Sequence, residues 1–455
     1  MEDYRTPGVY VKEISNLPPS VAGVATAIPA FVGFTEKCTE KFKPVKVTSL
    51  LDYTSKFGGS CELTIDEEGK LQGHKFVMYD SIRLFYDNGG GTCYVASAGT
   101  YEDAEDIDSS SYTQNETLDY LAGIDEITMI LFPDAVMLLE DDKQLGKLQQ
   151  AALNHCAELK DRIAILDFPE DVKPEDFRTN LGSTGLSYGA AYYPFLKTTY
   201  TKNISFDEML KISDIETKLG NAGYNKDKFD QLEEEKKDLR KRTLISKVPE
   251  YAEKLAELQD EASVIPPSAA IAGIICAVDE NKGVWQAPAN VSIASVSDVT
   301  VRLSDKEQAE YNVDNDYGKS INVIRYFQGK GIIVWGARTL DGNSNEWRYI
   351  PVRRLYNYVE ESIQKSIQWA IFQPNDANTW IKIRCQIENF LSNLWRDGAL
   401  AGSTPEQAFY VRVGLNVTMD ANDIQAGRLN VEIGLAAVRP AEFIVLKFSH
   451  KVQEA

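Results

Sequence analysis

The stretch AFVGF at residues 30–34 is apolar and carries no charged side chain. Three short, mainly apolar runs of the same kind follow it: CYVA at 93–96, ITMILF at 127–132 and IAIL at 163–166. Continuous apolarity, rather than alternation, indicates strands that are buried on both faces. Since a helical pattern at 141–160 separates the last two runs, residues 25–200 predict a layered α/β domain.

Between residues 201 and 262 the composition changes to Lys, Glu, Asp and Leu. Apolar residues recur there at helical spacings, which predicts amphipathic helices broken near residues 220–223 and at Pro249. We interpret 201–262 as a charged helical insertion. In the simplest interpretation, this segment is a solvated helical hairpin with one packed face. The alternative is that it binds a partner. Residues 263–318 then return to the α/β domain with an apolar helix expected to pack on the sheet.

Residues 319–455 predict a C-terminal α+β domain. Pro351 stands in the first turn of a long helix, where proline is preorganised. A second helix at 380–395 ends at Gly398, and strand patterns follow at 409–413 and 429–434. The expected fold class is therefore multidomain, α/β plus α+β.

Both ends of the chain have the composition of short strands without a neighbour in sequence. TPGVYVKEI at 6–14 and FIVLKF at 443–448 are rich in β-branched and aromatic residues. A strand without a ladder partner can pair with an exposed sheet edge on another molecule, although it can also close a sheet within its own subunit. We predict an N-terminal arm at 1–24 and a C-terminal strand arm, with linking residues Val9, Tyr10, Val11, Ile14, Phe443, Ile444, Val445 and Leu446.

The composition excludes several classes of protein. The 455 residues are 43% hydrophobic and 25% charged, as in ordinary folded proteins, and no apolar run reaches the roughly 20 residues of a membrane helix. Six separated cysteines, with no CxxC pair and no signal-peptide pattern before them, indicate a reducing compartment. A formal net charge of −20 disfavours nonspecific nucleic-acid binding.

The charge is unevenly distributed along the chain. Residues 101–142 contain no Lys or Arg, whereas residues 319–354 are basic. Arg353 and Arg354 fall in the first turn of the predicted long helix, where the helix dipole disfavours cations. Either a carboxylate of the same chain or an acidic surface of a partner can compensate them.

A search for catalytic and metal-binding patterns finds one superficial match. GLSYG at 185–189 fits the GxSxG nucleophile elbow, but a strand pattern with an early proline follows it where the elbow needs a helix. Only His74, His155 and His450 could serve Ser187 as a base. There is no zinc-ligand spacing, dinucleotide fingerprint or P-loop, so we expect no cofactor, no metal and no enzyme.

Six stretches resemble one known family, the sheath subunit of contractile phage tails and of related bacterial contractile injection systems. They are TPGVYVKEI at 6–14, PPSVAGVATAIPAFVGF at 18–34, PPSAAIAGIICAVDENKGVWQAPAN at 266–290, INVIRYFQGKGIIVWGARTL at 321–340, and residues 347–376 and 427–448. The insertion at 201–262 has no clear counterpart in the resemblance.

The resemblance implies a structural subunit that polymerises into a helical sheath of stacked hexameric rings and contracts to drive an inner tube through a target envelope. It implies the inner tube, baseplate and terminator or cap proteins as partners, with no nucleic acid and no membrane insertion. Assembly in the bacterial cytoplasm, as part of a phage tail or of an extracellular or anchored tail-like particle, follows from the same resemblance. Under it, Arg353 and Arg354 become hypothetical contacts to the inner tube.

Two other functions fit parts of the sequence. One is a serine hydrolase that uses Ser187. The other is a static shell or surface-layer protein, which would also exchange strands but would have no contracted state.

Overall fold

The computed structural model describes residues 20–446 except residues 67, 104–106, 114–116, 140 and 315, without the side chains of 103 and 234. The described residues form two compact units. The α/β unit comprises residues 25–358 and 439–446, and the C-terminal unit comprises 20–24 and 359–438. The predicted linking residues Val9, Tyr10, Val11 and Ile14 lie outside the described residues.

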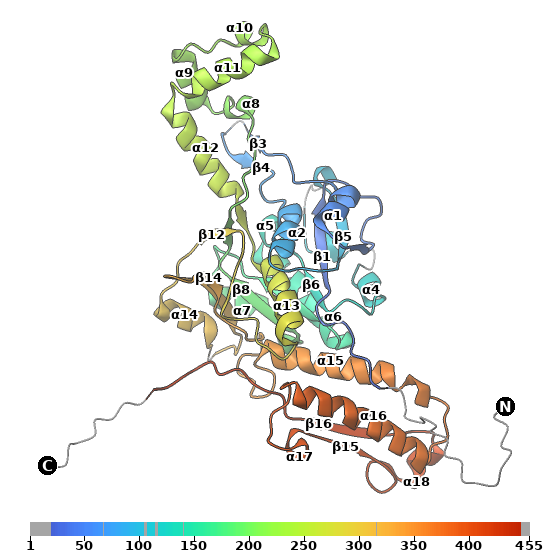
Figure 1. The fold of residues 1–455 in the computed structure, drawn as a ribbon. Helices are drawn as coiled ribbons and strands as arrows, with labels where there is room; N and C mark the ends of the chain where they lie inside the picture. The colour runs from blue at the N-terminus through green and yellow to red at the C-terminus, as the bar shows by residue number, and fades with distance from the viewer. Residues whose placement is uncertain are drawn as a thin grey trace, which may run out of the picture. The chain divides into compact units, whose positions relative to one another are not determined.

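A nine-stranded mixed sheet forms the centre of the α/β unit (Figure 1). The strands from β5 to β13 pair in parallel, and antiparallel strands complete both sides. In spatial order they are β11 (Val291–Ser292), β14 (Gly331–Val334), β13 (Ile321–Phe327), β8 (Gly189–Tyr193), β7 (Ile163–Asp167), β6 (Met129–Leu131), β1 (Pro29–Thr35), β5 (Cys93–Thr100) and β2 (Val45–Val47).

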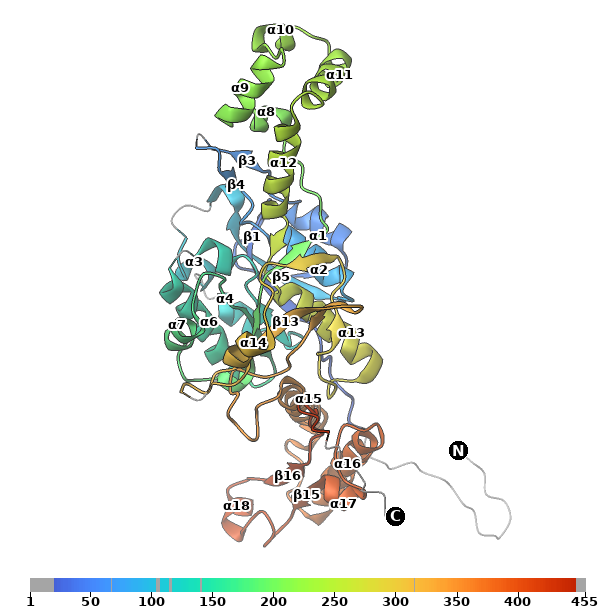
Figure 2. The same ribbon diagram turned by 90° about the vertical axis from the view of Figure 1, so that its left-hand side faces the viewer.

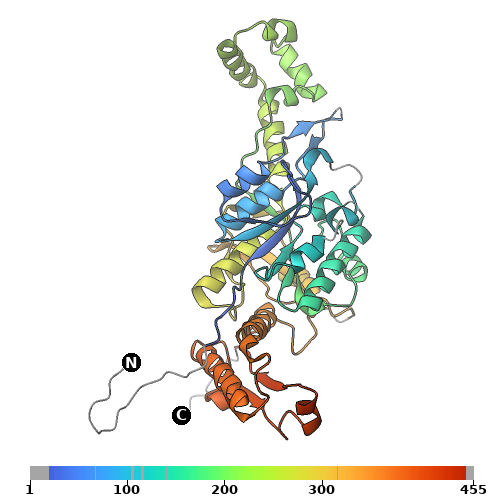
Figure 3. The same cartoon turned by 90° about the vertical axis from the view of Figure 1, so that its right-hand side faces the viewer.

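Helices cover both faces of this sheet, as Figures 2 and 3 show from opposite sides. Alternate residues of β1 belong to two separate cores: Phe31 packs with one set of helices, and Ala30 and Val32 with the other. This explains the continuous apolarity of AFVGF, since each face of the strand meets a helical layer. The first layer contains α1 (Leu50–Phe57), α2 (Met78–Asp87) and α13 (Ser268–Lys282), and the second contains α3 (Ser110–Thr113), α4 (Thr117–Ala122), α6 (Asp142–Leu159) and α7 (Pro174–Asn180).

Smaller elements complete the α/β unit. A three-stranded sheet has the order β10, β9, β12. Its strands and the remaining short elements are β9 (Leu196–Thr198), β10 (Val264–Ile265), β12 (Val296–Val299), β3 (Thr64–Ile65), β4 (Leu71–Gln72), α5 (Ala135–Leu138), α14 (Asp305–Asn312) and the 3-10 turns Tyr101–Asp103 and Leu186–Tyr188.

The boundary between the units differs from the one expected at residue 319. β13 pairs in parallel with β8, with Ile321 opposite Ala191, and β14 extends the same sheet. Both strands therefore belong to the α/β unit, and the C-terminal domain predicted at 319–455 begins too early. The unit boundary instead falls within α15 (Ile350–Ser366), between Tyr358 and Val359. Local patterning identifies these strands but does not specify which sheet receives them.

The segment predicted as a helical insertion is helical. It leaves the three-stranded sheet after β9 and returns at β10, which pairs with β9. Its helices share a hydrophobic core with Leu63, Ile65 and Leu71 of the β3–β4 region, and the Glu208 carboxylate accepts a 2.6 Å hydrogen bond from the Ile65 N–H. The helices are α8 (Phe206–Met209), α9 (Ser213–Asn221), α10 (Lys226–Asp230), α11 (Glu234–Ile245) and α12 (Pro249–Ala262).

The C-terminal unit combines helices with a two-stranded sheet. Asp376 caps the N-terminus of α16 (Ala377–Arg396), and Gly398 follows that helix with φ +88°, as the sequence predicts. α16 packs on β15 (Phe409–Val413), which pairs antiparallel with β16 (Val431–Leu435). The other elements are a 3-10 turn at Gln368–Ala370, α17 (Pro405–Ala408) and α18 (Ala421–Gln425).

Two aspartates are buried in the α/β unit with a single backbone hydrogen bond each. Asp134 accepts from the Phe34 N–H at 2.7 Å, and Asp167 accepts from the Ser268 N–H at 2.8 Å. Burial raises the pKa of each carboxyl from the ordinary 3.8 to about 7. The folded protein therefore binds more protons than the unfolded chain between these two pH values.

We expect the free energy of unfolding to fall as pH rises from 5 to 7, by at most about 1.4 kcal/mol per pH unit for each carboxyl, because the folded carboxyl keeps its proton in this range while the unfolded one has lost it. Asp134→Asn and Asp167→Asn should each flatten this dependence, since an amide oxygen can still accept the backbone hydrogen bond. Urea unfolding at several pH values measures the slope. Glu388→Gln on the surface is the control, and unchanged slopes in both buried variants would refute the assignment.

Candidate subunit interface

The last described residues of the chain form an exposed apolar segment. Residues 441–446 carry no strand pairing within the described chain. Phe443, Ile444, Val445 and Leu446 are 69 to 79% exposed, although three of them have β-branched or aromatic side chains suited to a strand. A run of four exposed apolar residues is unfavourable in water unless a partner covers it. The described part of this segment is unpaired, as expected for a strand without a neighbour in sequence. Its pairing with another copy stays a prediction.

The C-terminal unit contains a strand with an open side. β15 pairs with β16 on one side, and no other described strand pairs with it. Its outer edge therefore offers unpaired N–H and C=O groups, which is the usual template for strand addition. The alternation along β15 also suits a strand partner, because Val411 is buried while Tyr410 and Arg412 are exposed on the opposite face.

The same unit exposes several large apolar side chains. Phe372 is fully exposed with a φ of +64°, and Val417 is 62% exposed. Exposed apolar side chains indicate an interaction site when they form one contiguous patch, so these residues are candidates for contacts with other subunits. The exposed set is Ile371, Phe372, Ile381, Tyr410, Leu415 and Val417.

Arg354 is buried in the α/β unit. Its guanidinium forms a two-pronged ion pair with Asp279 of α13, with distances of 2.8 and 2.6 Å, and donates at 2.8 Å to the Thr26 carbonyl. Burial alone lowers the pKa of Arg354, but the adjacent Asp279 charge outweighs this effect and raises the pKa overall. The compensating anion at the start of α15 is thus a carboxylate of the same chain.

Arg353 is also buried, and aromatic rings surround it. Its guanidinium carbon lies 4.0 Å from the ring centre of Trp347 and 4.6 Å from that of Tyr188, and its Nε donates to Asn357 at 2.8 Å. Both guanidinium groups are buried, so neither is available for direct contact with a partner in this conformation. The structure therefore does not support the inner-tube contact hypothesised for Arg353 and Arg354.

The basic region at 319–354 is largely internal as well. The Lys319 ammonium donates to the carbonyls of Arg178 and Leu181, and Arg338 forms an ion pair with Glu442. Both cations are buried. The excess of positive charge in this stretch thus supports the architecture of the α/β unit, and it does not by itself indicate a basic outer surface.

The environment of Ser187 differs from that of a catalytic serine. Ser187 lies in the 3-10 turn Leu186–Tyr188, which leads into β8 and does not follow it. A nucleophile elbow requires the opposite order, strand first and helix second. None of the hydrogen bonds in the described chain joins Ser187 to a histidine, and the buried His155 Nε2 has no hydrogen-bond partner. The geometry does not support the hydrolase alternative.

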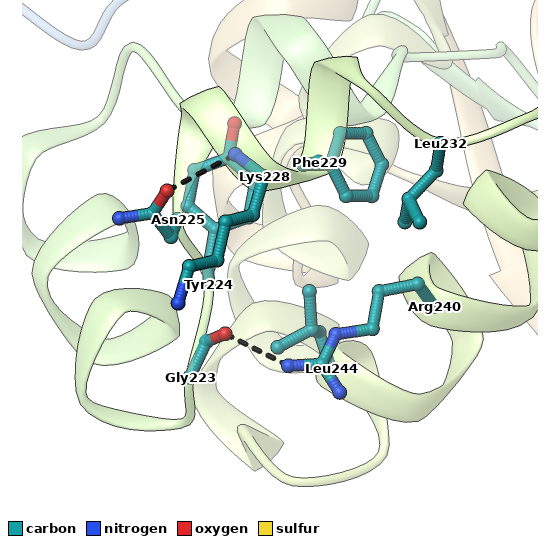
Figure 4. A pocket seen from close by; sticks show the side chains of 8 residues that line it. All are labelled: Gly223, Tyr224, Asn225, Lys228, Phe229, Leu232, Arg240 and Leu244. Carbon is teal, nitrogen blue, oxygen red and sulfur yellow. Dashed lines mark hydrogen bonds between the residues drawn. The ribbon is translucent and has the colours of Figure 1, made fainter.

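A cavity of about 280 Å³ lies within the helical insertion, and Figure 4 shows the residues that line it. Arg240 at its wall donates to the Gly223 carbonyl at 2.8 Å, and no carboxylate, imidazole or thiol lines it. The cavity therefore lacks the side chains that most often bind metal ions.

Among the described residues there is no group of three or more potential metal ligands. Likewise, no helix in the described part of the chain is both long and apolar enough to cross a bilayer.

Comparison with known proteins identifies the family. The profile of the phage tail sheath protein central domain matches residues 111–340, and that of the phage tail sheath C-terminal domain matches 343–451. The tail sheath proteins of Vibrio phage KVP40 and Enterobacteria phage T4 are 25% identical over 144 residues and 27% identical over 127 residues. These alignments cover 32% and 28% of this chain and 21% and 19% of those proteins, so the chain spans about a fifth of the length of the curated relatives it matches.

Two solved structures match over nearly their whole length. One is the sheath complex of the extracellular contractile injection system PVC in its contracted state, at 30% identity and a TM-score of 0.66, covering 100% of this chain and 99% of that one. The other is the helical sheath of the anti-feeding prophage in its contracted state, with the same identity and TM-score, covering 99% and 100%. The fold and the matches thus define a structural subunit of the contractile sheath type. The chain belongs to the phage tail sheath family.

Sequence reasoning found the exposed apolar end but missed two other features. Glu442, which directly precedes the exposed segment, binds Arg338, and β15 has an open edge because β16 is its only partner among the described strands. The Arg338–Glu442 ion pair joins residues that are 104 positions apart, so the local sequence at 438–443 gives no sign of it. The isolated strand pattern at 409–413 was the available signal for the second.

The buried Arg354–Asp279 pair allows a direct test of its internal role. Asp279→Ala should lower the free energy of unfolding by about 3 to 5 kcal/mol, because it leaves the Arg354 charge buried without its carboxylate. Urea unfolding followed by circular dichroism measures the change. The matched control is Asp298→Ala, which removes the exposed pair with Arg302 and should cost at most about 1 kcal/mol. Equal effects of the two variants would contradict the assignment.

Proposed function

We propose that this protein is the sheath subunit of a contractile tail-like particle and polymerises with copies of itself into a helical tube of stacked hexameric rings. The observation that carries the proposal is the exposed apolar strand sequence at 443–446 in a chain that also holds an open edge at β15. The match to the PVC and anti-feeding prophage sheaths over nearly the full length supports it.

The link between subunits is strand addition. Residues 443–446 of one copy add to the open edge of β15 in another, so that backbone N–H and C=O groups on both sides gain partners. Covering the apolar side chains contributes about 1.5 to 3 kcal/mol for each one that becomes fully buried. The N-terminal residues Val9, Tyr10, Val11 and Ile14 act as a second arm of the same kind.

Contraction follows from having many linked copies. Each subunit has two packings with different free energies, and the arms keep the copies joined while the compact bodies change their mutual contacts. Small gains per subunit add up along the tube, and the sum drives an inner tube through a target envelope. The protein thus works as a mechanical element and not through a catalytic group.

The remaining partners follow from this role. An inner tube, a baseplate and a terminator or cap protein bound the sheath along its axis and at its two ends. Assembly takes place in the bacterial cytoplasm, and the finished particle is a phage tail or a tail-like injection system that is either released or anchored. This part of the proposal rests on similarity to the sheath and baseplate structures of such particles.

Proline in the C-terminal arm tests the link. Ile444→Pro and Val445→Pro each remove a backbone N–H donor from the arm, so at least one of them should abolish hollow tubes while the protein stays folded. Negative-stain electron microscopy and circular dichroism check the two outcomes. Val445→Thr is the control, because threonine keeps the donor and suits a strand. Tubes in both proline variants would refute strand addition, and flat arrays in the unmodified protein would favour a static shell.

Removal of residues 1–18 tests the second arm. We expect a folded protein that forms no tubes and stays monomeric during sedimentation, because the proposal requires both arms to join the copies. Tubes formed by the shortened protein at the same concentration as by the full chain would show that the N-terminal arm is not required.

A further inference from the structure

The C-terminal arm begins at a side chain that the α/β unit holds from three sides. The Glu442 carboxylate accepts from Arg338 Nε at 3.0 Å, from Arg338 Nη2 at 2.7 Å, from Asn312 Nδ2 at 2.9 Å and from the Tyr349 hydroxyl at 3.0 Å. The next residue, Phe443, is 69% exposed. A closely bound residue is thus followed immediately by the exposed arm.

The partners of Glu442 are themselves fixed. The Arg338 side chain is only 5% exposed, and its backbone exchanges two 2.7 Å hydrogen bonds with the Asn322 side chain of β13. The Glu442 side chain is 22% exposed. Although burial alone raises the pKa of Glu442, the hydrogen bonds and charge of Arg338 lower it overall, so the carboxylate is ionised at neutral pH. A two-pronged pair between an arginine and a carboxylate also sets direction, because both groups are planar.

The two ends of the chain have different attachments. Near the N-terminus, the Ala22 and Val24 N–H groups donate to the hydroxyls of Ser366 and Ser362 at 3.3 and 3.2 Å, within the C-terminal unit. Glu442 and all its partners belong to the α/β unit. The two ends of the described chain are therefore attached to different units. Glu442 attaches the C-terminal arm to the α/β unit.

We propose that Glu442 and Arg338 form a clasp that fixes the origin and direction of the C-terminal arm and so prepares it to pair with a second copy of this chain. The proposal rests on the proposed function, in which residues 443–446 add to a sheet of another copy. Because its origin is fixed, the arm has fewer conformations to lose when it pairs. The smaller entropy cost strengthens association without any added contact. Glu442 is a positioning residue, since it does not itself contact the second copy.

Sedimentation at increasing protein concentration tests the clasp through the critical concentration for tube formation. In the full-length chain, Glu442→Ala should raise this concentration on the order of tenfold or more, because it leaves Arg338 unpaired and frees the arm. Glu442→Gln should have a smaller effect in the same direction, since the amide keeps some of the hydrogen bonds. The matched control Asp298→Asn removes an exposed ion pair of the same unit and should leave the concentration unchanged.

A spin label reports on the arm directly. With Cys38, Cys61 and Cys385 replaced by serine, a nitroxide at Phe443→Cys should be restricted below the critical concentration and become mobile when Glu442→Gln is added. Unfolding followed by circular dichroism shows that each variant is folded, and Glu442→Gln carries the test if Glu442→Ala is not. Equal mobility with and without Glu442, or an unchanged critical concentration, would overturn the clasp.

Deletion of residues 443–455 separates this proposal from the one it rests on. If the deletion abolishes tubes while both Glu442 variants assemble like the unmodified protein, the arm is needed and the clasp is wrong. If the deletion leaves tubes intact, the pairing of the C-terminal arm is wrong, and the clasp loses its role with it.

Discussion

The α/β unit depends on one buried ion pair, between Arg354 and Asp279. It joins the first turn of α15 to α13, and through the Thr26 carbonyl it also holds the chain just before β1. A guanidinium removed from water is tolerated only when its charge and donors are matched, so these three segments must be in place together. α15 begins in the α/β unit and ends in the C-terminal unit. The Arg354–Asp279 pair therefore anchors the first turn of a helix that belongs to both units.

This use of arginine explains why the charge pattern alone was misleading. A run of cations at 319–354 reads in sequence as a basic surface, but Lys319, Arg338, Arg353 and Arg354 are all buried. Their partners lie far away in sequence or are backbone carbonyls, and neither leaves a trace in local composition. Of the two anions that could compensate Arg354, the structure contains the internal one, the Asp279 carboxylate.

Much of the fold could be predicted because it depends on local signals. The run AFVGF is buried on both faces, Gly398 ends α16 in a left-handed conformation, and the charged stretch at 201–262 is mainly helical. The placing of β13 beside β8 could not be predicted, since strand order is decided by packing between distant segments. For the interface, an apolar end without a neighbour in sequence is a local signal, whereas the Glu442 contacts and the open side of β15 depend on the assembled fold.

The attachment of the helical insertion has a consequence for engineering. The chain enters it from β9 and leaves it into β10, and these two strands pair directly, Leu196 opposite Ile265. Its two ends are therefore held about 5 Å apart, the spacing of neighbouring strands. A foreign domain whose own termini lie close together can replace the helices α8–α12, provided that Leu63, Ile65 and Leu71 are made polar and that Lys202, which pairs with the buried Asp80, is kept. The position is thus a natural site for displaying cargo or an affinity tag on every copy of the protein.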